Sequence, residues 1–141
     1  MFTPITISTV IPADVNQVWE CWNTPEHIVN WNFASDDWHC PRSENDLRVG
    51  GKFNATMAAR DGSMSFDFEG VYDVVEPLTR IEYSLADDRH IVVLFEEVEG
   101  GVKVTETFDA ETENSIEMQR AGWQSILDNF AKYVSSVSVP K

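Results

Sequence analysis

The chain has few basic side chains and no long hydrophobic run. Lys and Arg number 10 against 24 Asp and Glu, so the formal net charge is −14 over 141 residues. Such a surface repels nucleic-acid phosphates and anionic lipid, and we expect neither a nucleic-acid nor a membrane partner. The longest apolar run, residues 91–95, is far shorter than the ~20 residues of a membrane-spanning helix.

Cysteines, linkers and repeats are also scarce. The only cysteines are Cys21 and Cys40, and the N-terminus alternates polar with apolar residues without a basic region. This start predicts a strand and not a signal peptide. Two cysteines without a secretory signal favour free thiols in the cytoplasm, and Cys21 lies in an apolar helical pattern that predicts packing. We expect one domain over residues 1–141.

The N-terminal part of the chain predicts one strand and two helices. Hydrophobic residues make up 43% and aromatic residues 11%, which is enough for a real core. Residues 3–11 alternate as a strand, and Pro12 ends the strand and opens an amphipathic helix. Thr24 and Pro25 are typical of a second helix start, which we expect to run to about residue 31. Residues 32–46 have no period and predict a long loop.

From residue 47 the apolar period changes to two. It predicts strands over 47–57, 66–74, 81–85, 91–98 and 102–108, separated by turn residues such as those at 61–62, 87–88 and 100–101. Gly50 and Gly51 indicate a bend or bulge inside the first of these strands. With residues 3–11, the result is a six-stranded antiparallel sheet.

The last predicted element is a long helix over residues 114–134. Asn114 and Glu117 resemble a capping box. One apolar face is formed by Ile116, Trp123, Ile126, Leu127, Phe130 and Val134. A helix of this length can cross a whole sheet and cover its aromatic face.

Three segments carry a family resemblance: VWECWNTPEHI (18–28) followed by Trp31, DLRVGGKF (46–53) continuing to GVY (70–72) and EP (76–77), and the pair Gly122–Trp123. In order and spacing they resemble the bacterial homologues of the activator of the heat-shock-90 ATPase, in the START-like (SRPBCC), polyketide-cyclase-like superfamily. The resemblance implies an α+β helix-grip fold. In that fold a curved sheet wraps around a long C-terminal helix, two short helices follow the first strand, and a cavity lies between sheet and helix.

Large apolar side chains are the candidates for lining such a cavity. Aromatic residues are most often simple core, but an aromatic wall with a few polar groups is also typical of a small-molecule site. Phe66, Phe68 and Tyr72, opposite Trp123, are the strongest candidates, and Trp123 is predicted either to plug the core or to form a cavity wall. The full candidate set is Trp19, Trp22, Trp31, Phe33, Trp38, Phe53, Phe66, Phe68, Tyr72, Tyr83, Phe95, Glu106, Trp123 and Leu127.

Glu106 is the one candidate for acid–base chemistry. If Val104 and Phe108 point inward, alternation makes Glu106 point inward too, and burial would raise its pKa unless it is paired. It could then orient a ligand or transfer a proton. The alternatives are a bulge that turns it outward or a position in a solvent-filled mouth.

No metal or cofactor is expected. His39 and Cys40, with Asp36 and Asp37 nearby, fit no standard zinc spacing. The chain also has no phosphate loop, dinucleotide fingerprint or catalytic-triad signature.

Three functions remain open. The first is binding of a small hydrophobic ligand in the cavity, without catalysis. The second is a cyclase or dehydratase that uses Glu106 with Tyr72 or Tyr83. The third is a chaperone-related interaction module, which predicts an exposed apolar patch outside the pocket. The sequence is compatible with a monomer or a homodimer.

Overall fold

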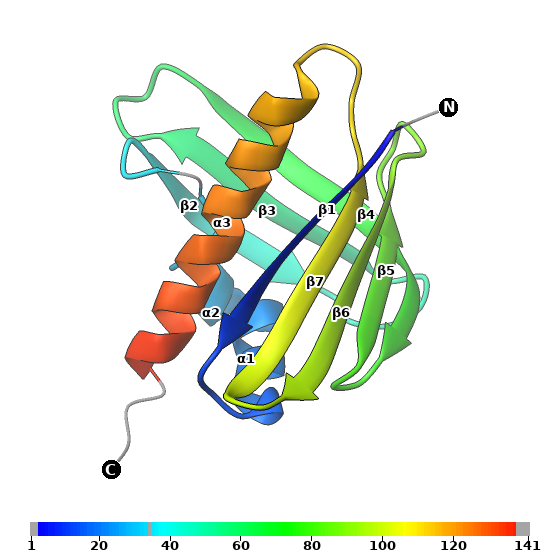
Figure 1. Cartoon of the computed structure of the whole chain (residues 1–141). Coiled ribbons are helices and arrows are strands. Elements are labelled where there is room, and N and C mark those ends of the chain that lie inside the picture. Colours follow the sequence, from blue (N-terminus) through cyan, green and yellow to red (C-terminus); the bar gives the residue numbers. More distant parts are fainter. Residues whose placement is uncertain (1–2, 34, 138–141) are drawn as a thin grey trace.

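A curved antiparallel sheet wraps around one long helix in the computed structural model, which describes residues 3–33 and 35–137 (Figure 1). The sheet has seven strands in the order β1-β7-β6-β5-β4-β3-β2. This is the predicted helix-grip fold. The elements in chain order are β1 (Pro4–Ile11), α1 (Val15–Asn23), α2 (Pro25–Ile28), β2 (Trp38–Asn45), β3 (Lys52–Ala59), β4 (Ser65–Glu76), β5 (Arg80–Ser84), β6 (His90–Val98), β7 (Gly101–Asp109) and α3 (Ile116–Val137).

Strands β3 to β7 form the predicted meander. Its tight turns contain residues in the left-handed region, Gly62 (φ 80°), Asp88 (φ 73°) and Gly100 (φ 93°), at three of the predicted turn positions. The first strand does not pair with the second. It lies beside the last strand, with Ile5 opposite Phe108, so β1 and β2 are the two edges of the sheet.

The filled core lies between α3 and the β1–β7–β6 side of the sheet. Leu127, Phe130 and Val134 of α3 are buried there. The helix begins at Ile116, two residues later than predicted, because Ser115, and not Asn114, accepts the Met118 N–H (3.1 Å). Asn114 instead donates its side-chain N–H to Glu111 (2.8 Å). The helix ends at Val137, one turn beyond the predicted end.

The two short helices follow the expected order with corrected ends. Residue Asp14 caps α1 by accepting the Gln17 N–H (2.9 Å), so the helix begins at Val15 and not at Pro12. Pro25 opens α2 as predicted, but the Thr24 side chain makes no capping bond, and α2 ends at Ile28.

The predicted loop over 32–46 contains a seventh strand, β2, so the expected count of six strands was wrong. The sequence of β2, WHCPRSEN, does not look like a strand, because it is mostly polar and contains Pro41. An edge strand tolerates both, since only one side of it pairs. The register against β3 shifts between His39 and Arg42, where Pro41 lies.

Two strand boundaries also differ. Residues 46–51 form a turn, so Leu47, Val49 and Gly51 are not strand residues and β3 begins at Lys52. Gly50 (φ 83°) provides the bend and donates its N–H to the Tyr72 carbonyl (2.8 Å). In β4, which extends two residues beyond the predicted end at residue 74, the register shifts between Tyr72 and Val74, and Val75 packs on the core.

Both cysteines are free and buried, and burial raises the pKa of each thiol. Cys21 is a fully buried core residue, as predicted. Among the described residues no helix is both long and apolar enough to cross a membrane.

Candidate ligand-binding cavity

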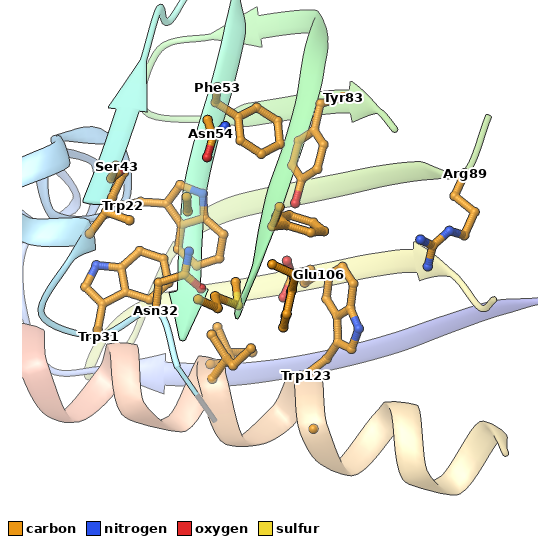
Figure 2. A pocket seen from close by; sticks show the side chains of 18 of the residues that line it. Trp22, Trp31, Asn32, Ser43, Phe53, Asn54, Tyr83, Arg89, Glu106 and Trp123 are labelled. Carbon is orange, nitrogen blue, oxygen red and sulfur yellow. The ribbon is translucent and has the colours of Figure 1, made fainter. Parts of the chain in front are cut away.

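A cavity of about 440 Å³ lies between α3 and the β3–β4–β5 side of the sheet (Figure 2). It occupies the half of the sheet–helix interface that the core leaves unfilled. Ten of the predicted residues line it: Trp22, Trp31, Phe53, Phe66, Phe68, Tyr72, Tyr83, Glu106, Trp123 and Leu127. Their role in binding stays a prediction.

Four predicted residues do not line the cavity. Phe95 is a core residue beside α1, where its ring meets the edges of Trp19 (5.2 Å between centroids) and Trp22. Trp19 therefore packs away from the cavity. Trp38, on the edge strand, makes an edge-on contact with Phe66 (5.9 Å between ring centroids). Phe33 contacts α3 through its backbone, because its carbonyl accepts the Asn129 side-chain N–H (3.1 Å).

Aromatic rings form the sheet-side wall. Phe53 makes an edge contact with Tyr83 (4.7 Å between centroids) and lies 5.3 Å from Tyr72. Phe53 stands opposite Gly70 in the neighbouring strand, and a Cβ atom at Gly70 would lie 2.9 Å from the Phe53 ring. Because Gly70 has no side chain, the Phe53 ring can pack over it.

The helix-side wall contains Trp123 and the gap beside Gly122. The Trp123 ring packs edge-on against Phe68 (5.8 Å between centroids) and stacks on Phe108. A Cβ atom at Gly122 would meet no atom within 4 Å. The cavity therefore owes part of its width to the glycine on this turn of α3.

The mouth lies between β4 and the first turn of α3. Phe66 and Met118 line the cavity, yet they are 48% and 62% exposed to solvent. An exposed apolar side chain on each side of an opening gives an apolar molecule a favourable surface on entry.

Glu106 is buried at the centre of the cavity wall, with only 5% of its surface exposed. Strand β7 keeps a regular register with both neighbours, and no bulge turns the side chain outward. The facing residues are Ile7 and Val93, both apolar and buried. No described residue hydrogen-bonds to the carboxyl group, and desolvation alone raises its pKa to about 8.

Tyr83 is the second buried polar group that lines the cavity. It is 6% exposed, and its hydroxyl group points into the same space as the Glu106 carboxyl group (Figure 2). Burial raises the pKa of the Tyr83 hydroxyl well above its usual value, and the nearby Glu106 charge raises it further. The hydroxyl has no hydrogen-bond partner among the described residues.

Tyr72 differs because its hydroxyl group is already paired. It donates to the Asn45 side-chain oxygen (2.6 Å), and the Asn45 side-chain N–H donates to the Asn23 carbonyl (2.6 Å). This chain ties β4 through β2 to the end of α1. Sequence reasoning missed Asn45, since it lies in a segment predicted to be a loop.

The end of the cavity near the β7–α3 loop is polar. Gln119 is buried and holds this loop: its side-chain N–H groups donate to the carbonyls of Glu111 (3.0 Å) and Asn114 (2.9 Å), and its oxygen accepts the Glu111 N–H (2.8 Å). Arg89 lies on the same wall and forms an ion pair with Asp87 (2.8 Å). Periodicity gives no sign of these residues, because Gln119 and Arg89 are polar.

The sheet, the long helix and the cavity between them define a START-like helix-grip domain. The model of the family described as "Activator of Hsp90 ATPase homolog 1-like protein" matches residues 12–135, and the chain belongs to this family. No protein among those with curated functions matches the chain significantly.

Solved structures agree with this assignment. An AHSA1-like protein from Aeromonas hydrophila, solved by NMR, is 47% identical with a TM-score of 0.90, and the match covers 96% of this chain and 94% of that chain. A protein from Cytophaga hutchinsonii is 44% identical (TM-score 0.81, covering 94% and 92%). A crystal structure from Chromobacterium violaceum, at 23% identity (TM-score 0.84, covering 94% and 97%), shares the fold.

Proposed function

We propose that the protein binds a small, largely apolar molecule in the cavity between α3 and the sheet, and that it does so in the cytoplasm. The observation that carries the proposal is an unfilled volume of about 440 Å³ with aromatic walls on both sides. Pockets for small molecules fall in this size range, and their linings are mainly apolar with a few placed polar groups.

The family description names activation of the Hsp90 ATPase. A chaperone-related interaction module would need an exposed apolar patch outside the cavity. The cavity itself supports ligand binding instead. Phe66 and Met118, two of the large apolar side chains that the fold leaves exposed, belong to the cavity mouth.

A thermal-shift screen of fused-ring aromatic compounds, preceded by native mass spectrometry of the purified protein, tests the proposal. A ligand at 100 times its dissociation constant stabilises the folded state by about 2.7 kcal/mol. The control is Gly122→Leu, whose side chain extends into the open space beside Gly122 and should abolish the shift. Equal shifts in both proteins would place binding elsewhere, and no shift with any compound would contradict the proposal.

A second candidate function is proton transfer on the bound molecule. The pKa of about 8 at Glu106 supports it, because such a group exchanges a proton readily near neutral pH. The carboxylate would accept a proton from the carbon beside a carbonyl group, and the resulting acid would return it to the same molecule. Exchange of that hydrogen in D₂O, followed by NMR, tests this function. Exchange that persists in Glu106→Gln would contradict it.

A further inference from the structure

Glu106 and Tyr83 are two buried polar side chains of the cavity wall. They belong to different strands, β7 and β5, and both are more than nine-tenths buried. Neither the carboxyl group nor the hydroxyl group has a hydrogen-bond partner among the described residues. Their oxygen atoms border the open space of the cavity, so a molecule that enters the cavity can supply the missing hydrogen bonds.

The side chain at position 106 of β7 points into apolar surroundings, where an apolar residue would also fit. The adjacent inward residues, Val104 and Phe108, are apolar, as are the two residues opposite in the neighbouring strands. Folding alone gains nothing from a carboxyl group among them, since its removal from water is unfavourable. A partner that arrives from outside the chain would supply the missing hydrogen bonds.

We propose that this buried part of the cavity wall recognises an uncharged carbonyl oxygen on a flat, otherwise apolar ligand, through hydrogen bonds donated by Glu106 and Tyr83. The proposal rests on the proposed ligand-binding function and adds the chemical class of the ligand.

The donor count supports a carbonyl oxygen. A protonated carboxyl group and a tyrosine hydroxyl group each donate one O–H, and a carbonyl oxygen offers two lone pairs to receive them. Because burial raises the pKa of Glu106 to about 8, the carboxyl group is mainly protonated at neutral pH. The other titratable groups on the cavity wall are Tyr72, which is bonded to Asn45, Glu44 at an exposed position of β2, and Arg89 and Glu111 at the polar end.

The walls beside the two donors select a flat molecule. Phe53 packs on Tyr83 from the sheet side, and Trp123 packs against Phe68 from the helix side. Aromatic rings favour stacked or edge contacts with other rings. A ring system between these walls would direct a carbonyl substituent towards Glu106.

Three naphthalene compounds of nearly the same shape test the proposal by isothermal titration calorimetry at pH 7. They are methyl naphthyl ketone, ethylnaphthalene, which lacks the oxygen, and naphthylethylamine, which carries an ammonium group. We expect the ketone to bind about tenfold or more tightly than the hydrocarbon, a difference of about 1.4 kcal/mol. The reason is that the hydrocarbon displaces water and leaves both donors unpaired.

Variants assign the difference to the two donors. Glu106→Leu and Tyr83→Phe should each lower the affinity for the ketone about tenfold without lowering that for the hydrocarbon, which no longer leaves that donor unpaired. Glu106→Gln keeps an N–H donor and should retain most of the preference. Tyr72→Phe is the matched control, since the Tyr72 hydroxyl is committed to Asn45. Thermal unfolding of each variant verifies that it is folded.

The outcomes separate the two proposals. Equal affinity for ketone and hydrocarbon would overturn the carbonyl inference and leave the ligand-binding function standing. Tightest binding of the amine would also overturn it, in favour of an ionised Glu106. If none of the three compounds binds and the thermal-shift screen is also empty, the proposed function fails, and this inference fails with it.

Discussion

The indole ring of Trp123 lies parallel to the phenyl ring of Phe108, with an angle of 8° between the planes and 3.9 Å between the centroids. Phe108 is fully buried in the core, whereas the Trp123 ring also lines the cavity. The sequence left open whether Trp123 plugs the core or forms a cavity wall. The geometry gives it both roles, one on each side of the same ring.

Replacing Trp123 should therefore affect stability and binding together. We expect Trp123→Ala to lower the free energy of unfolding by about 3 kcal/mol, measured by urea titration, because the stacked contact is lost. It should also weaken the binding of methyl naphthyl ketone. Trp19→Ala is the control, since Trp19 packs on Phe95 away from the cavity and should change stability only. An unchanged affinity in Trp123→Ala would leave the residue with a core role alone.

Glu106 should make stability depend on pH in a defined window. Its pKa is raised from 4.5 to about 8 by folding, so the folded state holds a proton that the unfolded state has lost. Stability contributed by this proton is complete below about pH 4.5 and is lost as the pH rises to about 8. The loss should be about 1.4 kcal/mol per pH unit within the window.

Urea titrations of the native protein and of Glu106→Gln across pH 4 to 9 measure this effect. As the pH rises, the native protein should lose stability relative to Glu106→Gln, because the glutamine amide cannot ionise. Glu96→Gln, at an exposed position, should follow the native protein. Parallel curves for Glu106→Gln and the native protein would show that Glu106 is not desolvated.

Gly122 offers a stabilising substitution. Gly122→Ala should raise the free energy of unfolding by about 0.5–1 kcal/mol, since glycine is unfavourable inside a helix and the added methyl group meets no atom within 4 Å. Ala121→Gly, at the exposed neighbouring position, should lower the free energy of unfolding by a similar amount. Thermal melts of both variants measure the pair, and a destabilised Gly122→Ala would mean that the position is crowded.

The cap of α3 distinguishes two adjacent residues. Ser115→Ala should lower stability by about 1 kcal/mol, because the Met118 N–H loses its acceptor at the start of the helix. Asn114→Ala should have a smaller effect, since its side chain bonds only to Glu111 on the surface. If Asn114→Ala were the more damaging change, the predicted capping box would be the better description.

Periodicity predicted the parts of the fold that bury one regular face. The alternation of β7 indicated an inward Glu106, and the apolar face of α3 indicated the buried Leu127 and Phe130. Edge strand β2 escaped prediction, because an edge needs no apolar alternation and accepts Pro41. The bulge in β4 also escaped, since it depends on pairing with β5 and not on local sequence.

The candidate site was less predictable than the fold. Its aromatic members could be listed from residue type alone, but the side of α1 on which each tryptophan lies depends on tertiary packing. The bonds of Tyr72 to Asn45 and of Gln119 to the β7–α3 loop join residues distant in the sequence. A single sequence gives no signal for such pairs.

The pairing of β1 with β7 also sets the order of events during synthesis. The first strand leaves the ribosome long before the last, yet Ile5 finds its partner only when Phe108 has emerged. Until then, the apolar face of β1, with Ile5, Ile7 and Ile11, has no cover. Completion of the sheet therefore waits for the strand pair that is most distant in the sequence, which makes the fold slow to form and exposes its first strand to aggregation or to chaperones.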